Sequence, residues 1–276
     1  MHELDVAIRA AQAAGSLLLE HFHAGVTADF KGEKDIVTAA DTAAQDEIIR
    51  IIRMEFPDDD LYAEESAENV FTGGRQWVID PLDGTINFSC GIPLFGVSIA
   101  LVDGDRRLCG VIFLPAFDEM YTATAGGGAF CNGNPIRVSE NKESAHAVIA
   151  MNDFNIGPTA KVGNLNLLKR EMLEHVLADC MRLKNFGSAA AELAYVADGR
   201  LDAYLVLFTY PWDMAAGALL VEEAGGRVTD YYGEPAKLDE QCILVSNGHL
   251  HQAYIERTGT AEHGSLQRRV EAIFAI

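Results

Sequence analysis

The chain has 276 residues, and its 41 acidic against 21 basic residues give a formal net charge of −20 at pH 7. This charge argues against binding to nucleic acid or to an anionic membrane surface, because both would repel an acidic protein. A content of 49% hydrophobic and 22% charged residues is typical of a globular protein. The length suits one large domain or two smaller ones that share a core.

Cysteine usage and the first residues predict a cytoplasmic location. The five cysteines are odd in number and include no C-x-x-C pair, which indicates reduced thiols. The opening MHELDVAIRAAQAAG is acidic and amphipathic and lacks the basic and apolar regions of a signal peptide. No apolar run reaches the roughly 18 residues of a membrane-spanning helix. We therefore expect neither a membrane nor a nucleic acid as a partner.

The first half of the chain predicts helices packed on a largely antiparallel sheet. Apolar residues at helical spacing predict helices over 3–23 and about 41–54, with a polar loop over 24–37 between them. Asp103-Gly104-Asp105 predicts a hairpin turn between two strands. Short apolar runs predict strands at 61–63, 77–79, 97–102, 108–114 and 120–123.

The second half alternates strands with helices, an α/β pattern. Its predicted strands are 148–151, 201–208 and 243–245, and its predicted helices are about 162–178, 189–198 and 213–224. The polar stretch 138–147 predicts the boundary, which divides the chain into halves 1–142 and 143–276. A short helix is expected over 262–275, packed either on the body of the protein or on a partner.

The segment WVIDPLDGTINF, residues 77–88, is the most informative part of the chain. Pro81 and Gly84 disfavour regular structure, which predicts a turn carrying Asp80 and Asp83 at the end of a buried strand. Two acids held together in a turn repel each other unless a cation lies between them. Hard oxygen ligands without a nearby His or Cys favour Mg²⁺ over Zn²⁺. For this motif alone, a metal-free acidic turn that caps a helix remains the alternative.

Gly84 and Thr85 follow the two acids and add a second signal. Their backbone N–H groups and the threonine hydroxyl would offer hydrogen-bond donors to a phosphate group beside the cation.

Three further acidic elements are weak when taken singly. Glu64 and Glu65 stand at the end of a short predicted strand, where paired glutamates are ordinarily solvated. Asp41 ends the run DIVTAAD, and either Thr38 or Asp41 would serve as the N-cap of the following helix. Asp213 lies near a predicted helix start, where the helix dipole would also stabilise a carboxylate acting as a cap.

Taken together and in this order, the motifs D-x-V-T-x-x-D, E-E, W-V-I-D-P-L-D-G-T-x-N-F, G-S-A-A, W-D-x-A-A-G and E-A-G-G resemble the inositol monophosphatase family. The resemblance runs from about Lys31 to Thr229. It implies a Mg²⁺-dependent, Li⁺-sensitive phosphatase with a layered αβαβα sandwich, combining an α+β half and an α/β half. It also implies a homodimer and a site between the two halves, where ligand clefts are common.

The resemblance assigns roles to individual residues. Asp41 and Thr85 would hold the attacking water, with Glu64 as a further catalytic residue and Glu65 supporting it. The backbone of Gly84 and Thr85 would bind phosphate oxygens. The ligands of two or three Mg²⁺ ions would be Glu64, Asp80, the Leu82 carbonyl, Asp83 and Asp213. The substrate contacts would be Asp83, Gly84, Thr85, Ala189, Val206 and Asp213. The loop Lys31–Asp35 resembles a mobile segment over the metal site.

The substrate is less well determined than the reaction. Typical members carry a glutamate that contacts inositol hydroxyls seven positions before the second-site aspartate, where this chain has Val206, which accepts no hydrogen bond. Phe208 and Tyr210 could form an aromatic wall for another alcohol, although core packing would also explain Phe208. We therefore predict hydrolysis of inositol monophosphate or a related sugar phosphate. Histidinol phosphate, fructose 1,6-bisphosphate and nucleotides or NADP remain alternative substrates, and a regulatory metal-binding protein is the non-enzymatic alternative.

Overall fold

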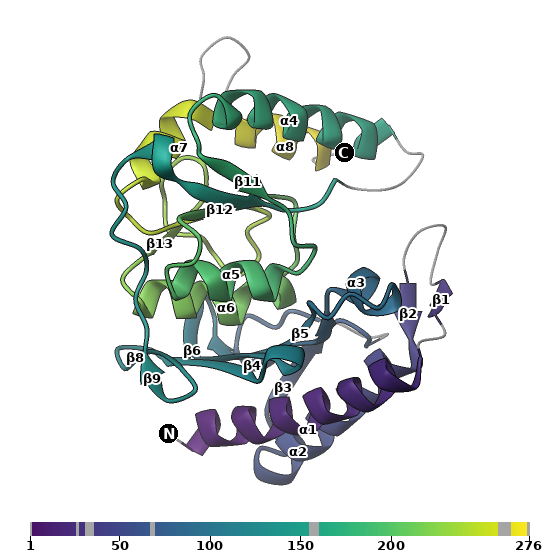
Figure 1. Ribbon diagram of the computed structural model, residues 1–276. Coiled ribbons are helices and arrows are strands. Elements are labelled where there is room, and N and C mark those ends of the chain that lie inside the picture. Colours follow the sequence, from purple (N-terminus) through teal and green to yellow (C-terminus); the bar gives the residue numbers. More distant parts are fainter. Residues whose placement is uncertain are drawn as a thin grey trace.

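The computed structural model describes residues 2–25, 28–30, 36–66, 70–154, 160–258 and 266–274. Its elements are stacked in five layers, with helices outside both sheets and a helical layer between the sheets (Figure 1). Three clusters of buried residues fill the four spaces between the layers. This arrangement confirms the predicted αβαβα sandwich.

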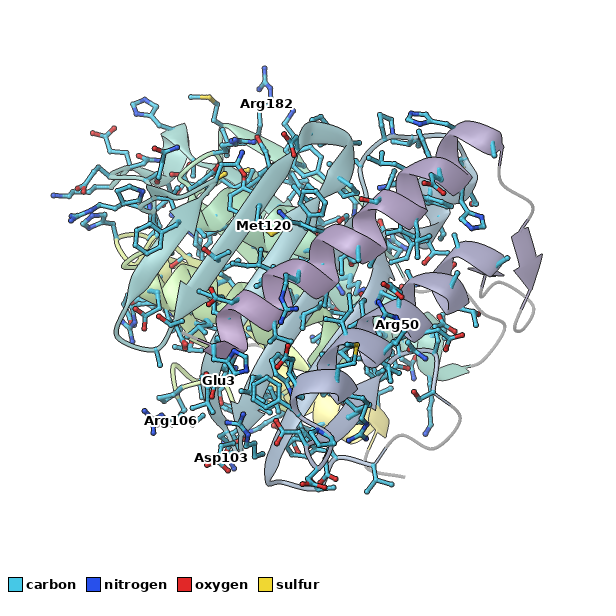
Figure 2. All side chains as sticks on the ribbon, turned by 90° about the horizontal axis from the view of Figure 1, so that it is seen from below. Glu3, Arg50, Asp103, Arg106, Met120 and Arg182 are labelled. Atoms are coloured by element: carbon cyan, nitrogen blue, oxygen red, sulfur yellow. The ribbon has the colours of Figure 1, made fainter. Side chains whose placement is uncertain are left out.

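The first layer consists of α1 (His2–Ala24) and α2 (Ala39–Glu55), which lie side by side across a sheet (Figure 2). Their bounds confirm the two helices predicted in the first half. Small residues of α1, among them Ala7, Ala11 and Ala14, are completely buried and allow close packing. Gly15 shows how close: a Cβ atom there would lie 2.5 Å from the ring of Phe113.

The second layer is a seven-stranded sheet in the order β3-β4-β5-β6-β7-β8-β9. Only β3 and β4 pair in parallel, so the predicted, largely antiparallel sheet is confirmed. The hairpin turn predicted at Asp103-Gly104-Asp105 joins β5 to β6. The strands are β3 (Asp60–Ala63), β4 (Arg75–Asp83), β5 (Gly96–Asp103), β6 (Arg106–Leu114), β7 (Glu119–Thr124), β8 (Gly128–Cys131) and β9 (Asn134–Pro135).

The predicted turn around Asp80 and Asp83 is wrong in detail, because both residues lie within β4. Asp80 is in register with Ser98 and Asp83 with Gly96, and the register shifts between these two pairs. Pro81 has no N–H to donate to the ladder, so the strand bulges there instead of ending. The bulge brings both carboxylates to the end of the strand.

The loop predicted over 24–37 contains two short strands, β1 (Ala28–Phe30) and β2 (Ile36–Thr38), which pair antiparallel. Three-residue strands give too short an alternation to be recognised among polar residues. The predicted mobile segment Lys31–Asp35 lies outside the described residues.

The middle layer is formed by α5 (Ala189–Ala197) and α6 (Pro211–Glu223), which pack between the two sheets (Figure 1). The second sheet has the order β11-β10-β12-β14-β13 and mixes parallel and antiparallel pairs. The strands are β10 (Val148–Met151), β11 (Arg182–Lys184), β12 (Ala203–Leu207), β13 (Arg227–Thr229) and β14 (Cys242–Ser246).

The outer layer contains α4 (Ala160–Leu177), α7 (His251–Thr258) and α8 (Leu266–Phe274). Helix α8 packs against α4, and its Val270 is 2% exposed. Arg269 of α8 also forms an ion pair with Glu171 of α4. The carboxyl-terminal helix therefore packs on the body of the protein, one of the two alternatives that its sequence left open. None of the described helices is long and apolar enough to cross a membrane.

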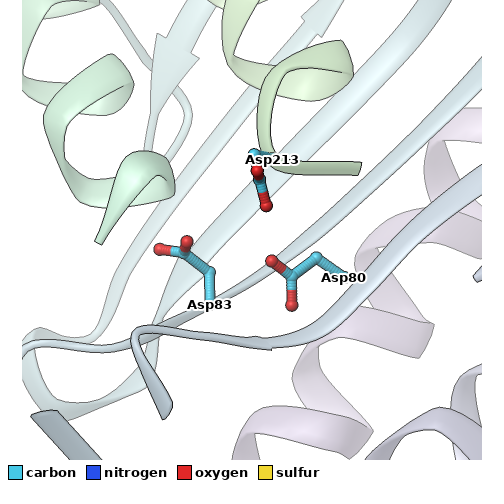
Figure 3. Close-up of side chains that lie close together, drawn as sticks. All are labelled: Asp80, Asp83 and Asp213. Carbon is cyan, nitrogen blue, oxygen red and sulfur yellow. The ribbon is translucent and has the colours of Figure 1, made fainter. Parts of the chain in front are cut away.

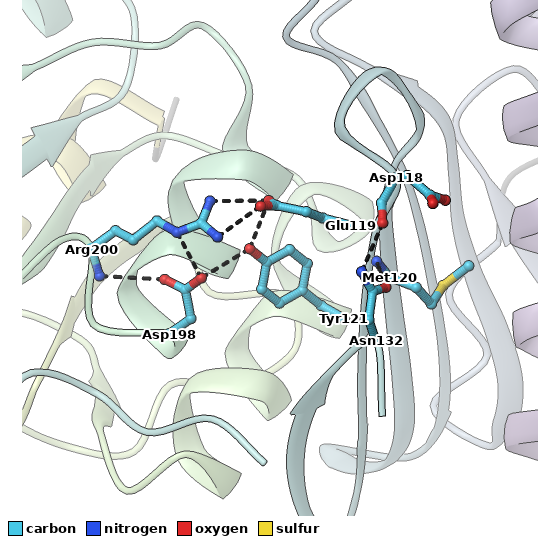
Figure 4. A network of polar contacts seen from close by, with 7 residues as sticks. All are labelled: Asp118, Glu119, Met120, Tyr121, Asn132, Asp198 and Arg200. Atoms are coloured by element: carbon cyan, nitrogen blue, oxygen red, sulfur yellow. Dashed lines mark hydrogen bonds and ion pairs between the residues drawn. The ribbon is translucent and has the colours of Figure 1, made fainter. Parts of the chain in front are cut away.

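A polar network joins the first sheet to the end of α5 (Figure 4). Arg200 donates to both carboxylate oxygens of Glu119, at 3.0 and 2.7 Å, and pairs with Asp198 at 2.9 Å. The hydroxyl of Tyr121 bonds both acids, at 2.9 Å to Glu119 and 3.0 Å to Asp198. These contacts fix β7 against the carboxyl end of α5.

Candidate active site

Three aspartates from two distant parts of the chain meet where the first sheet faces the helical layer between the sheets. Asp80, Asp83 and Asp213 each offer a carboxylate oxygen, and these oxygens all lie within 4.8 Å of one another (Figure 3). The first two come from the end of β4 and the third from the first turn of α6. Asp80 is 2% exposed and Asp83 is 8% exposed.

Asp83 is held by the amino terminus of α5. Its carboxylate accepts hydrogen bonds from the Ser188 hydroxyl, from Ala189 N at 3.1 Å and from Ala190 N at 3.0 Å. Burial nevertheless raises the pKa of Asp83 to about 7, because the carboxylate is removed from water and faces Asp213. The start of α5 therefore holds the Asp83 carboxylate in place. Its hydrogen bonds lower the pKa of Asp83, but by less than burial raises it.

Asp213 is fixed by the turn that precedes α6. It accepts hydrogen bonds from Thr209 Oγ1 at 2.9 Å and from Tyr210 N at 3.1 Å. Burial raises its pKa above the ordinary value of an aspartate. The predicted capping role is therefore present, and the same carboxylate also belongs to the cluster.

Asp80 lies close to three other acidic side chains. Its pKa is raised well above the ordinary value, first by burial and then by the charges of Glu64, Asp83 and Asp213. Glu64 follows β3 directly, and its backbone N donates to Ile79 O at 3.1 Å, which places it beside the end of β4. The cluster therefore includes a fourth carboxylate, in hydrogen-bond contact with Asp80.

This set of groups fits a divalent metal. Buried like charges at such separations are unfavourable unless protons or cations neutralise them. Every side chain in the cluster offers a carboxylate oxygen, the donor that hard divalent cations prefer.

A threonine connects this cluster to α2. Thr85 Oγ1 donates to the Leu82 carbonyl at 3.0 Å and lies 3.4 Å from Asp41 Oδ1. Asp41 is in the first turn of α2 and is 1% exposed. The residues assigned to the metal, to the water and to the carbonyl ligand thus lie together, although they come from four separate elements and from the residue that follows β3.

Gly84 stands at the N-cap of the short helix α3 (Thr85–Ser89) with φ +85°. A Cβ atom there would lie 3.1 Å from Leu94 O and 3.3 Å from Gly187 O, so glycine is required both by conformation and by space. The backbone consequently passes close to the start of α5.

A cavity of about 260 Å³ adjoins the aspartates on the side of the second sheet. Of the predicted substrate contacts, Ala189 lines the cavity, whereas Val206 is fully buried in the core and is not among the lining residues. Glu65 lies outside the cluster, where its N–H donates to Gln45 Oε1 at 2.9 Å. The lining residues are Asp83, Asn152, Asp153, Phe154, Gly187, Ser188, Ala189, Glu192, Tyr204, Phe208, Thr209, Tyr210 and Asp213.

Sequence reasoning missed several of these residues. Ser188 carried a signal, since a serine before a helix is a common N-cap, and its hydroxyl accepts from Ala191 N at 3.2 Å. Asp153 and Glu192 carried none, because a single acid after a strand or within a helix is ordinary. Only the packing of β10 and α5 brings them to the same cavity.

The chain is similar to known proteins along most of its length. Residues 1–263 match the model of the inositol monophosphatase family. The fructose-1,6-bisphosphatase/inositol-1-monophosphatase of Thermotoga maritima is 38% identical over 258 residues, covering 93% of this chain and 95% of its own. Nus factor SuhB of Salmonella typhimurium is 40% identical over 255 residues, covering 91% and 94%. The solved structure of the Thermotoga maritima IMPase superposes with a TM-score of 0.84 at 36% identity, covering 99% of this chain and all of its own.

Proposed function

The chain belongs to the inositol monophosphatase family, a group of phosphomonoesterases, and we propose on this premise that it hydrolyses monophosphates of inositol or of related sugars. The observation that carries the proposal is the cluster of the buried Asp80 and Asp83 with the partly exposed Asp213, which opens onto a cavity of about 260 Å³. The cluster would bind cations and the cavity would receive the alcohol of the substrate.

The proposed metal is Mg²⁺, with two or three ions in the site. When bound, such ions lower the pKa of a coordinated water, neutralise the phosphate and stabilise the departing alcohol oxygen. The residues that would hold them are Glu64, Asp80, Asp83, Asp213 and the Leu82 carbonyl oxygen.

The chain's own groups would orient the reactants. Thr85 Oγ1, which bonds the Leu82 carbonyl and faces Asp41, would hold the attacking water, and Asp41 would receive its proton. Backbone N–H groups of Gly84 and Thr85 would bind phosphate oxygens as negative charge develops. Water attacks directly in this scheme, so we expect no phosphoenzyme intermediate.

A regulatory protein without catalysis is the competing function, and the name of the Salmonella relative, Nus factor SuhB, gives it substance. The complete set of acids argues against a regulatory function without catalysis, because the chain contains Asp41, Glu64, Asp80, Asp83 and Asp213. A chain relieved of catalysis would not need to maintain a cluster whose pKa values are raised by burial and mutual repulsion. The cytoplasm and a homodimer are further parts of the proposal.

Phosphate release from a panel of esters tests the proposal directly. The panel comprises inositol 1-phosphate, fructose 1,6-bisphosphate, histidinol phosphate, adenosine 3′,5′-bisphosphate and NADP, each with Mg²⁺, with EDTA and with Mg²⁺ plus Li⁺. We expect release that requires Mg²⁺ and is inhibited by Li⁺. Absence of release from all five esters, with Mg²⁺ binding intact, would favour the regulatory function instead.

A further inference from the structure

Phe208 has an unusual backbone conformation. It follows β12 directly, and its φ of +68° lies in the left-handed region. Among the described residues other than glycine, only Asp118 and Asn132 share a positive φ. Aspartate and asparagine enter this region more often than other residues, because their short polar side chains bond the local backbone, whereas a phenylalanine is disfavoured there. A glycine would adopt the same conformation without this penalty.

Two neighbouring segments hold this conformation in place. The N–H of Phe208 donates to Gln241 O at 2.7 Å, and its carbonyl accepts from Asn152 Nδ2 at 3.1 Å. The same side chain donates to the Leu207 carbonyl at 3.1 Å and accepts from the Leu207 N–H at 3.2 Å. These bonds fix the bend after β12 whichever side chain residue 208 carries. Because a glycine would satisfy the bend, the presence of a ring indicates that the ring has a role of its own.

The ring lies on the wall of the cavity beside the aspartates. Phe208 is half-buried, packs in part against the buried cluster beneath the outer helices, and lines the cavity. Its ring contacts that of Tyr210 at 5.4 Å between centroids. The next two residues of the chain, Thr209 and Tyr210, both donate hydrogen bonds to Asp213, at 2.9 and 3.1 Å. The ring is therefore held at a fixed place relative to a proposed metal ligand.

Three polar side chains of this cavity already bond to neighbouring groups of the protein. The amide of Asn152 bonds the backbone at the end of β12 through both its nitrogen and its oxygen. The hydroxyls of Ser188 and Thr209 donate to Asp83 and Asp213 respectively. Hydroxyl groups of an entering alcohol would compete with these internal partners.

The two acids of the cavity outside the aspartate cluster are also engaged. Glu192 accepts from Phe186 N at 2.8 Å and bonds the hydroxyl of Tyr204. Burial raises the pKa of Glu192 to about 8, so this carboxyl group is largely uncharged near pH 7. The exposed Asp153 interacts with the buried ammonium of Lys169. The Phe208 ring, by contrast, offers an apolar surface that no internal hydrogen bond has to yield.

From these observations we infer that Phe208 is a specificity-determining residue: its ring binds the apolar face of a cyclic alcohol, which the cavity selects by shape more than by hydrogen bonds to its hydroxyl groups. The C–H groups of a cyclic polyol form such a face, and contact with an aromatic ring removes both surfaces from water. The inference rests on the proposed phosphatase activity, because the ring acts on the alcohol of that reaction.

The test compares inositol 1-phosphate with cyclohexyl phosphate, which has the same six-membered carbon ring without free hydroxyl groups. A site built to hydrogen-bond hydroxyls rejects an analogue that lacks them by about 10⁴-fold or more. We expect the wild-type kcat/KM values for the two esters, measured with Mg²⁺, to lie within about tenfold of each other. A larger preference for inositol 1-phosphate would overturn the inference.

Phe208→Leu separates contact with the ligand from packing in the core, because leucine keeps much of the apolar volume but has no flat face. We expect the variant to melt within about 4 °C of the wild type. Its KM should rise about tenfold for both esters, while kcat changes less than about threefold. Phe117→Ala, which removes an exposed ring outside the cavity, should leave KM unchanged. A wild-type KM in the leucine variant would assign the ring to core packing and overturn the inference.

A second pair of variants tests the strained conformation. Phe208→Gly and Phe208→Ala both remove the ring, so their KM values should rise together. The glycine variant should melt about 2 °C or more above the alanine variant, because only glycine avoids the left-handed penalty. Equal melting temperatures would overturn the inference, because the ring would then occupy an unstrained position. These failures would all leave the phosphatase standing, whereas absence of Mg²⁺-dependent release from both esters would overturn the proposed function as well.

Discussion

Ser188 donates a hydrogen bond from its hydroxyl to Asp83, a residue 105 positions earlier in the chain. The same carboxylate accepts the first free N–H groups of α5, at Ala189 and Ala190. A strand of the first sheet is thereby joined to the helical layer between the sheets by one of the proposed metal ligands. If Asp83 is a metal ligand as proposed, binding of the metal would be linked through this one side chain to the contact between the first sheet and the helical layer.

Replacement of this ligand tests both roles. We expect Asp83→Asn to abolish Mg²⁺-dependent phosphate release while the protein remains folded. The amide nitrogen would face an N–H donor at the start of α5, which should cost about 1–3 kcal/mol of stability. Circular dichroism, thermal unfolding and phosphate release measure the three effects. Near-normal activity in this variant would show that the ligand assignment is wrong.

Asp80→Asn provides a contrasting change in the same cluster. The Asp80 carboxylate is buried and faces three other acids, whereas an asparagine keeps an oxygen to accept from Leu82 N. We expect this variant to be more stable than the wild type in EDTA at about pH 8, by about 1–3 kcal/mol. It should also lose Mg²⁺-dependent activity. A destabilised variant in EDTA would mean that repulsion does not govern the metal-free site.

The hydroxyl of Thr85 is the group that we propose orients the attacking water. Thr85→Val removes the group that bonds the Leu82 carbonyl and faces Asp41, while it conserves the side-chain volume. We expect kcat to fall about 10²–10⁴-fold with a smaller change in KM. Thr85→Ser restores a hydroxyl and is the matched control. Equal kcat in the valine and serine variants would show that the Thr85 hydroxyl does not take part in catalysis.

Acid sensitivity should arise in part from His251, outside the proposed active site. It is completely buried between the hydroxyls of Thr229, at 2.7 Å, and Ser246, at 2.8 Å. Burial lowers its pKa from 6.5 to about 4, with a smaller contribution from Arg227. Between these values the unfolded chain binds more protons than the folded one, so stability is complete above about pH 6.5 and falls as the pH falls toward 4.

The expected loss from this one group is about 2 kcal/mol between pH 7 and pH 5. Urea unfolding of the wild type and of His251→Gln at the two pH values measures it. The variant will be less stable at pH 7, because two buried hydroxyls lose a well-fitted partner, but its stability should depend less on pH. An equal dependence in both proteins would assign the acid sensitivity to other groups.

Much of the fold could be predicted from local patterns. A clear apolar period can be recognised where an element is long enough, as in α1 and α2 and in β5, β6 and β7. Strands of three residues, such as β11 and β13, are too short for this, and both were missed. The bulge in β4 was mistaken for a turn, because Pro81 and Gly84 are typical of both and only the pairing with β5 distinguishes them.

The sequence by itself determined which acids belong together, because the order of motifs from Asp41 to Asp213 is specific even though no single one is. It also determined the negative charge and the apolar side chain of Val206, seven positions before Asp213. The tertiary structure decided which residues surround these acids. Asp153 and Glu192 reach one cavity only because β10 and α5 pack there, and Val206 is withdrawn into the core. The sequence shows which chemical groups the chain contains and in what order they occur. Packing between distant elements sets the neighbours of each group, its pKa and its access to a ligand.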